Sequence, residues 1–317
     1  MVYLSRKFIE NCWQVGRGRI IPAFVLLFLL GLTACREDND DELDRTSANI
    51  TFEIETSMAS YDSINYDATH LRVIIEAVSL DGKTTKRDVS TSEHQQQDII
   101  TMSMTLPEDK YNVRIWCDFV PSNSSADHHF DTGRLHLGSV SHKGNYNGNT
   151  SKTAYSDYLY LDLEKVSGTN TYRVSPKAAT GRFSLIPSDM ESHIGDSVEI
   201  TFSYAGYFPL SYNVDKQLAS ANGLTPGVGF GYREKVERDK IIGIDDIFVC
   251  DTETILFADI QTKDSGGKII GNTRVRIPIY RGMNTILRCN LFTVGPSNGG
   301  IGVNDKFDDE IIVEVQN

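Results

Sequence analysis

Cys35 is the residue whose chemistry organises the start of the sequence. It directly follows Leu32-Thr33-Ala34, so a small residue precedes the thiol and a leucine stands three positions before it. This pattern is typical of a lipoprotein signal, in which Leu32, Thr33 and Ala34 form the signal peptidase recognition site. The cysteine then becomes the mature N-terminus and carries acyl chains, and two or more such chains anchor stably. We therefore expect lipid attachment at Cys35.

The segments on either side of Cys35 support this interpretation. Residues 1–19 are basic overall, and Ile20 to Leu32 form an apolar run. As a helix that run would rise only about 20 Å, whereas the hydrocarbon core of a bilayer is roughly 30 Å thick. A signal peptide over residues 1–34 is therefore favoured over a transmembrane span. Residues 35–48 are too charged to pack, and we expect an acidic, solvated tether that reaches at most about 45–50 Å.

A nucleophilic enzyme is the first alternative that the residue types allow. Gly195-Asp196-Ser197-Val198 resembles the nucleophile segment of one hydrolase family. That chemistry needs a histidine base, usually near the C-terminus, and no histidine follows His193. The segment is better explained as a turn and the start of a strand. We expect no catalytic residue and no enzymatic activity.

Metal and cofactor sites are similarly weak. Asp127-His128-His129-Phe130-Asp131 offers ligand types, but adjacent histidines converge only in a loop, and a solvated loop is the simpler explanation. Gly227, Gly229 and Gly231 lack a surrounding β-α unit, so an adaptable loop is expected instead of a phosphate cradle. The acidic run 304–310 lacks the spacing of a calcium loop. No metal and no cofactor are expected.

The five cysteines do not form a disulfide framework. Cys12 leaves with the signal peptide and Cys35 is lipidated, so Cys117, Cys250 and Cys289 remain. Three thiols cannot all pair internally, and no C-x-x-C spacing is present. We expect them to be buried as small apolar side chains.

Charge and composition exclude several classes of partner. The 317 residues are 40% hydrophobic, which fills ordinary cores and is too low for a multi-span membrane protein. The formal net charge is −12, and removal of the signal peptide, which contributes +3, leaves −15. Nucleic acid and anionic lipid surfaces both need clustered basic residues, so neither is an expected partner.

From Asn49 onward the hydrophobic pattern has a period of two, as in antiparallel strands with one buried face. Ile50, Phe52 and Ile54 alternate with polar residues, and Ile311, Val313 and Val315 share one face of a strand at the other end of the chain. Residues 121–157 are expected to be long loops, and residues 234–248 to hold one short helix. A restart near residue 176 divides the chain, and the strand count of each part suits a two-sheet sandwich. We predict two domains, 49–176 and 177–317.

A series of motifs in the second part of the chain resembles a known family. The series comprises Ala178-Ala179-Thr180-Gly181-Arg182-Phe183, Tyr204 to Asn213, Asp246-Ile247-Phe248-Val249, Ile277 to Thr285 and Gly299-Gly300-Ile301-Gly302-Val303. In this order the motifs resemble the fimbrillin-like and fimbrium-anchoring lipoproteins of Bacteroidetes. The likeness covers about residues 176–317 well, and the first part agrees in its cysteine signal and its order of strands.

This resemblance implies a fold, a location and a set of partners. The fold is all-β, with two tandem transthyretin-like antiparallel β-sandwich domains after the lipoprotein signal peptide. The protein is expected in the outer membrane, lipid-anchored and facing the exterior, because acidic residues after the cysteine are similar to a surface-export signal in such bacteria. Its partners would be the membrane, through acyl chains, other fimbrial subunits, and ligands on host or bacterial surfaces.

The resemblance also implies assembly by donor-strand complementation, a form of β-augmentation. Ile50, Phe52 and Ile54 would mark the removable first strand, and Ile311, Val313 and Val315 the strand that is offered or kept. Arg45 is the candidate protease site. Anchor, stalk and tip subunit all remain open.

A surface glycan-binding lipoprotein that does not polymerise is the alternative function. It is based on the long polar loops and on aromatic residues that could stack on sugars, namely Trp116, Tyr158 and Tyr160.

Overall fold

The computed structural model describes residues 46–56, 68, 70–93, 98–122, 124–164, 168–220, 228–293 and, for the backbone alone, 312–316. Within these ranges the chain consists of strands, loops and two short 3-10 turns, η3 (Leu135–Leu137) and η4 (Glu191–His193), with no α-helix. The all-β fold class predicted from the two-residue periodicity is therefore confirmed. No helix in this part of the chain has the length and apolar character needed to cross a bilayer.

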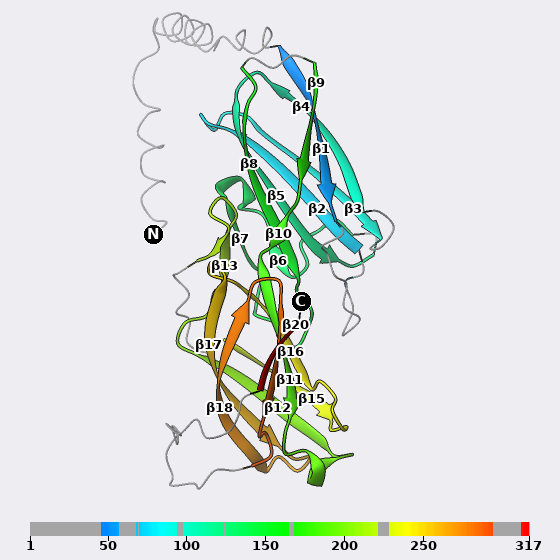
Figure 1. Cartoon of the computed structure of the whole chain (residues 1–317), viewed down its shortest axis with the longest axis vertical. Helices are drawn as coiled ribbons and strands as arrows, with labels where there is room; N and C mark the ends of the chain where they lie inside the picture. The colour runs from blue at the N-terminus through cyan, green and yellow to red at the C-terminus, as the bar shows by residue number, and fades with distance from the viewer. Residues whose placement is uncertain are drawn as a thin grey trace, which may run out of the picture. The chain divides into compact units, whose positions relative to one another are not determined.

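Two sheets form what we call the N-terminal sandwich (Figure 1). Their inner faces share one core, because alternate residues of each strand are apolar and point inward. Sheet A has the order β4 (Ile99–Pro107), β1 (Ser47–Glu55), β9 (Thr169–Val174). Sheet B has the order β10 (Lys177–Ala178), β8 (Ala154–Asp162), β5 (Lys110–Val120), β2 (His70–Ser79), β3 (Thr85–Glu93).

Two further sheets form the C-terminal sandwich, again around a shared apolar core. Sheet D has the order β16 (Gly243–Phe248), β11 (Thr180–Pro187), β19 (Asn284–Cys289), β20 (Ile312–Gln316). Sheet E has the order β15 (Gly229–Lys235), β12 (Ser197–Ala205), β17 (Glu253–Lys263), β18 (Ile269–Tyr280).

The two sandwiches repeat one strand topology. The first strand of each, β1 or β11, pairs antiparallel with β4 or β16 and parallel with β9 or β19. The facing sheets also correspond, since the order β8-β5-β2-β3 matches β18-β17-β12-β15, with antiparallel pairs throughout. One addition distinguishes the C-terminal sandwich: β20 extends its sheet beyond β19.

A small fifth sheet joins segments that are far apart in sequence. Sheet C has the order β14 (Leu218–Ala219), β13 (Ser211–Asn213), β7 (Ser139–His142), β6 (Phe130–Asp131), so residues 139–141 of the polar stretch 121–153 pair with residues 211–213. Beneath it lies a third apolar cluster, which we call the junction cluster because both sandwiches contribute to it. Its members are Ile74, Trp116, Phe130, Leu135, Val140, Ala154, Ala179, Tyr212, Val214, Ala219 and Phe248.

The short helix predicted within 234–248 is wrong. Strand β15 continues to Lys235, and β16 occupies Gly243–Phe248 with every residue buried. Ile247 faces the C-terminal core, while its neighbour Phe248 faces the junction cluster. Because both faces of β16 are buried, and two adjacent aspartates, Asp245 and Asp246, lie in its middle, polar and apolar residues do not alternate along it.

Gly181 illustrates why the motif around β11 contains a glycine. A Cβ atom at this position would lie 2.0 Å from the carbonyl oxygen of Tyr280, so only glycine permits this close approach of two backbones. By contacts between residues, Thr46–Asn317 form one compact unit. The domain limits 49–176 and 177–317 stay a prediction.

Candidate functional site

Strand β1 occupies the middle of sheet A, and Figure 1 shows it between β4 and β9. Ile50, Phe52 and Ile54 are fully buried in the core of the N-terminal sandwich. The register places Phe52 opposite both Met102 of β4 and Tyr172 of β9. Removing β1 would therefore leave two unpaired strand edges and an apolar slot between them.

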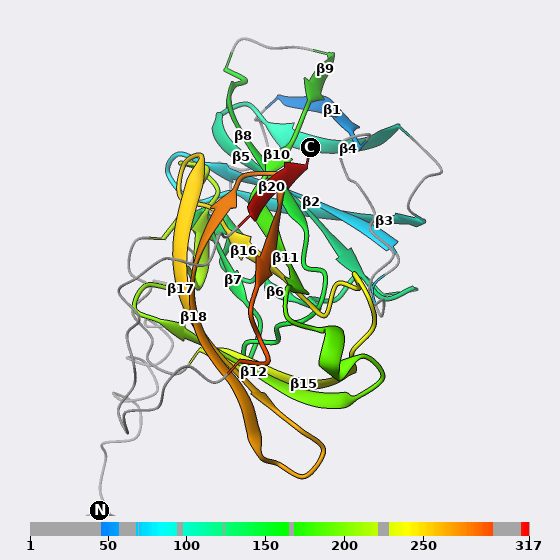
Figure 2. The ribbon, with the colours of Figure 1, turned by 60° about the horizontal axis from the view of Figure 1, so that its bottom comes forward.

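The last strand of the chain has a different setting. β20 pairs antiparallel with β19 at one end of sheet D (Figure 2), with Val313 opposite Leu287 and Val315 opposite Thr285. β20 therefore lies at the edge of sheet D, next to one strand, whereas β1 lies between two strands of sheet A. The roles of β1 and β20 in strand exchange stay predictions.

Several residues singled out in the sequence lie outside the described residues. They are the signal residues Leu32, Thr33 and Ala34, the lipidation residue Cys35, the protease site Arg45, and Ile311 at the start of the last run; the side chains of Val313 and Val315 are likewise outside the described part. Their assignments stay predictions.

A polar pocket lies in the stretch 128–152, beside β7. It has a volume of about 130 Å³ and is lined by three histidines (His128, His129, His142), two lysines (Lys143, Lys152) and two asparagines (Asn145, Asn147). Lys143, Asn145 and Asn147 are exposed, whereas Lys152 is buried. The pocket therefore has a solvent-facing rim and a buried wall.

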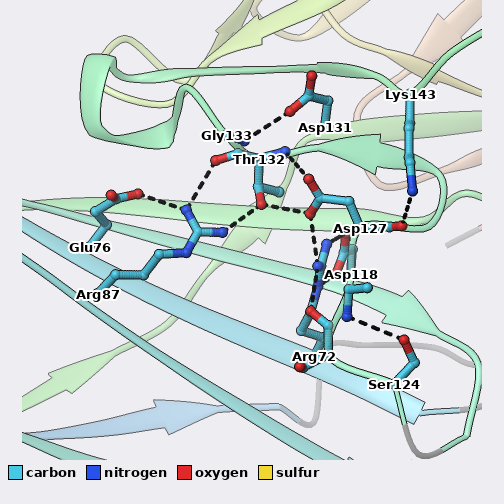
Figure 3. A network of polar contacts seen from close by, with 12 residues as sticks. Arg72, Glu76, Arg87, Asp118, Ser124, Asp127, Asp131, Thr132, Gly133 and Lys143 are labelled. Carbon is cyan, nitrogen blue, oxygen red and sulfur yellow. Dashed lines mark hydrogen bonds and ion pairs between the residues drawn. The ribbon is translucent and has the colours of Figure 1, made fainter.

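Asp127 fixes the loop that carries two of these histidines (Figure 3). Its carboxylate accepts hydrogen bonds from the backbone N–H of Thr132 at 2.9 Å, from the hydroxyl of Thr132 at 2.7 Å and from Arg72 Nη1 at 2.9 Å. Burial would raise the pKa of Asp127, yet these bonds from Thr132 and Arg72 hold the pKa below its usual value. The carboxylate therefore stays ionised and holds the loop against β2.

Arg72 is itself buried and also bonds Asp118 of β5, through Nε at 2.8 Å and Nη2 at 2.6 Å. Figure 3 shows a second arginine, Arg87 of β3, which joins Glu76 to Thr132. The loop 124–134 is thus attached to sheet B by two guanidinium groups. The sequence predicted a solvated loop at residues 127–131, whereas the structure shows this loop held to sheet B by hydrogen bonds from Arg72 and Arg87.

Two adjacent carboxylates of β16 hold the other side of the pocket. Lys152 Nζ bonds Asp245 at 2.5 Å, and Asp245 also accepts the hydroxyls of Tyr146 and Tyr204. Burial raises the pKa of Asp245 despite the charge of Lys152. Asp246 instead accepts the backbone N–H of Lys152 and the guanidinium of Arg182. The loop is therefore tied to the C-terminal sandwich through buried ionic groups.

His142, Lys152 and Asp245 were not found from the sequence. The available signal was the pair Asp245-Asp246 within the apolar run Ile241 to Phe248, because carboxylates in such a run must be paired when buried.

The interpretation of Trp116 as a surface aromatic is wrong. Trp116 is 0% exposed and packs edge-on against Phe130, with ring centroids 5.3 Å apart. The residue lies on the junction-cluster face of β5, because sheet B is covered on both faces there. Tyr160 is 52% exposed, and the hydroxyl of Tyr158 donates to Asn112.

The sequence analysis also considered Ser197, the histidines and the cysteines as residues that could do chemistry. Ser197 is the first, exposed residue of β12, and His193 bonds Asp196 at 3.2 Å. Within the described residues, no three His, Cys, Asp or Glu side chains gather as a metal-binding group. Cys117 and Cys289 are buried and lie outside any disulfide, as expected, and burial raises the pKa of Cys117, whereas Cys250 is partly exposed and bonds the hydroxyl of Tyr207.

The described residues define a class of all-β proteins built from packed antiparallel sheets. The chain belongs to a family of unknown function, DUF6562, whose model matches residues 39–317. A comparison with curated proteins finds no match.

Solved structures show distant likenesses. The tip fimbrial protein Mfa3 of Porphyromonas gingivalis is 9% identical, with a TM-score of 0.46 and coverage of 86% of this chain and 99% of that one. A proposed adhesin of Bacteroides ovatus is 14% identical, with a TM-score of 0.45 and coverage of 82% and 91%. A proposed polysaccharide-binding protein of Bacteroides thetaiotaomicron is 11% identical, with a TM-score of 0.43 and coverage of 78% and 93%.

Proposed function

We propose that this protein is a non-enzymatic, structural or adhesive subunit of surface fimbriae, held to the outer membrane by acyl chains on Cys35. The observation that carries the proposal is the position of β1. It is the first strand after the tether, it lies between β4 and β9, and its apolar side chains are buried in the slot between them. A strand near a chain end in this position can be replaced by a strand of another subunit with the same alternation.

The two ends of the chain have complementary properties. Loss of β1 would open a slot with two unpaired edges, whereas β20 pairs with one strand, β19, among the described residues. An edge strand loses fewer hydrogen bonds on release than a central one. We therefore propose that β20, or the chain around it, is the donor and that the β1 slot is the acceptor. Cleavage at Arg45 would precede release of β1.

The finer fold assignment belongs to the same proposal. The repeated seven-strand topology supports two tandem domains of one kind, and we assign them to the transthyretin-like class on the basis of the motif series from Ala178 to Val303. A stack of two such units holds its far end away from the membrane, which suits a fimbrial anchor, stalk or tip.

Cutting the chain after β1 tests strand exchange. We would insert a site-specific protease sequence after Thr56 in the unlipidated mature chain and cut it. The cut chain is expected to form oligomers that persist in mild detergent and differ by one subunit, because slow exchange replaces β1 by a neighbour's last strand. Electrophoresis without heating measures this ladder.

Matched controls make the result specific. Excess peptide 46–56 should suppress the ladder, whereas the same peptide with Phe52→Asp should not, because a carboxylate cannot enter the apolar slot. A chain that ends at Thr293 should remain monomeric after cutting. A cut full chain that stays monomeric and takes up no peptide would refute strand exchange.

Replacing the predicted lipidation residue tests the anchor separately. Cys35→Ala is expected to move the protein from the membrane fraction to the soluble fraction, because no acyl chain can be attached. Cys12→Ala is the matched control and should leave the protein in the membrane, since Cys12 is removed with the signal peptide. Fractionation followed by detection of the protein measures both. Recovery of Cys35→Ala in the membrane would contradict lipid anchoring.

A further inference from the structure

The buried pair formed by Lys152 and Asp245 brings an amine against a carboxyl group where water is excluded. Lys152 Nζ lies 2.5 Å from Asp245 Oδ1, and the two side chains are only 2% and 0% exposed. The nitrogen is therefore at most about 3.7 Å from the carboxyl carbon, because the C–O bond adds only about 1.2 Å. Reacting atoms held about 3–3.5 Å apart in a fixed orientation lose much of the entropic barrier to bond formation.

The second oxygen of Asp245 accepts two tyrosine hydroxyls. Tyr204 donates to Oδ2 at 2.7 Å, and Tyr146 donates to the same atom. Burial raises the pKa of both hydroxyls well above the ordinary value, so both remain protonated donors. Two fixed donors on one carboxyl oxygen form the arrangement that stabilises the negative charge which develops there during acyl transfer.

The two charges of the pair can be cancelled within it. Burial raises the pKa of Asp245, since a carboxylate loses its hydration there. Transfer of one proton from Nζ to the carboxyl group leaves a neutral amine beside a neutral acid, and burial favours these uncharged forms. Lys152 Nζ also donates to the carbonyl oxygen of Asn147 at 2.6 Å and, more weakly, to the hydroxyl of Tyr146 at 3.3 Å. These contacts fix the direction of the amine.

We propose that Lys152 and Asp245 condense to an isopeptide amide bond in the folded protein. Nζ bonds to Cγ, the bond from Cγ to Oδ1 breaks, and Oδ1 leaves as water with two protons from the ammonium group. The third proton stays on the amide nitrogen, directed at Asn147, and Oδ2 remains as the amide oxygen between the two tyrosine hydroxyls. The step conserves charge, because an ammonium and a carboxylate become a neutral amide and water, and it needs no oxidant or cofactor.

This bond joins the two sandwiches covalently. Lys152 lies shortly before β8 of sheet B, and Asp245 lies within β16 of sheet D. Tension on the chain must then break a covalent bond, where it would otherwise break an ion pair, before the sandwiches can separate at this point. Formation of the bond requires neither strand exchange nor lipid anchoring.

Mass spectrometry of the full mature chain, produced without acyl chains and then denatured, tests the bond. We expect an intact mass lower than that of the sequence by one water molecule. A tryptic digest should contain the peptide with Lys152 joined to the peptide with Asp245, and fragmentation should place the link on these two side chains. An intact mass equal to that of the sequence, or water lost within a single peptide, would overturn the proposal and leave an ion pair.

Two lysine variants test the assignment to Lys152. Lys152→Arg should have the full mass of its sequence, because a guanidinium stays protonated and does not condense. Lys143→Arg changes an exposed lysine of the same loop, so it is the matched control and should still lose one water molecule. Loss of water that persists in Lys152→Arg would place the reaction elsewhere and contradict the assignment.

Removing both hydroxyls with Tyr146→Phe and Tyr204→Phe tests the route. Phenylalanine keeps the ring packing while the donors to Oδ2 are lost, so the joined fraction should grow about a hundredfold more slowly after synthesis. Intact masses of samples taken at intervals measure this rate. Tyr160→Phe, at an exposed position, is the control and should form the bond as the unmodified protein does. Equal rates in the double variant and the unmodified protein would overturn the part assigned to the two hydroxyls.

Discussion

Replacing Arg182 by methionine is expected to destabilise the protein by about 3–5 kcal/mol, the range for removing one partner of a buried ion pair. Arg182 of β11 bonds Asp246 of β16 through Nε at 2.8 Å and through Nη2 at 2.9 Å. The two side chains are only 9% and 3% exposed. Methionine fills much of the same volume, so the loss reports mainly the carboxylate left without its charge partner. Urea unfolding followed by circular dichroism measures it.

The chain offers a matched control for this substitution. Arg274 bonds Asp259 in the same two-pronged geometry, at 2.6 and 2.7 Å, but both side chains are 37% exposed. Arg274→Met should cost no more than about 1 kcal/mol, because water screens the pair and solvates the remaining carboxylate. Equal losses in the two variants would contradict the assigned importance of burial.

The free energy of unfolding of Arg182→Met should also depend on pH in a way that differs from the unmodified protein. Burial would raise the pKa of Asp246, but Arg182, aided by Lys152, holds the pKa below its usual value. In the unmodified protein this carboxylate therefore contributes stability above its unfolded pKa, which is lost as the pH falls. Without Arg182 the folded pKa rises above the unfolded one, so stability is lost as the pH rises. The difference between the two proteins should consequently shrink from pH 7 towards pH 4.

Trp116→Ala is expected to cost about 3–5 kcal/mol, as for other large aromatic side chains removed from a core. Trp116 is fully buried in the junction cluster, with Phe130 and Phe248 packed edge-on against it. Trp116 lies on β5 of the N-terminal sandwich, Phe130 begins β6 of sheet C, and Phe248 ends β16 of the C-terminal sandwich. Because the ring joins the two, thermal unfolding should separate into two transitions when it is removed. Differential scanning calorimetry measures both effects.

Tyr160→Ala is the control for this second prediction. Tyr160 lies on β8 of the same sheet and is largely exposed, so its loss should change stability by about 0.5 kcal/mol or less. Unfolding of Trp116→Ala that matches Tyr160→Ala would contradict the role of the junction cluster. Loss of ligand binding in Trp116→Ala would report unfolding, because the indole ring is not available to a sugar.

Particular elements show how far sequence reasoning reached. The alternation of Ile50, Phe52 and Ile54 predicted a strand with one buried face, and β1 has that face. Strand β16 was misread because both of its faces are covered, which removes the alternation on which the prediction depends. The sequence indicated only part of the pocket beside β7. The adjacent residues His128 and His129 were recognised as possible ligands, whereas His142 and Lys152 were not.

The sequence by itself determined the all-β class and the polar and apolar faces of β1. Each of these follows from residue type and local spacing, because a strand exposes alternate residues to water. Only the tertiary structure decided that β1 is inserted between β4 and β9, that Trp116 lies between two sandwiches, and that His142 meets a group of donors. These facts depend on contacts between residues far apart in the chain, and such contacts leave no period in the sequence.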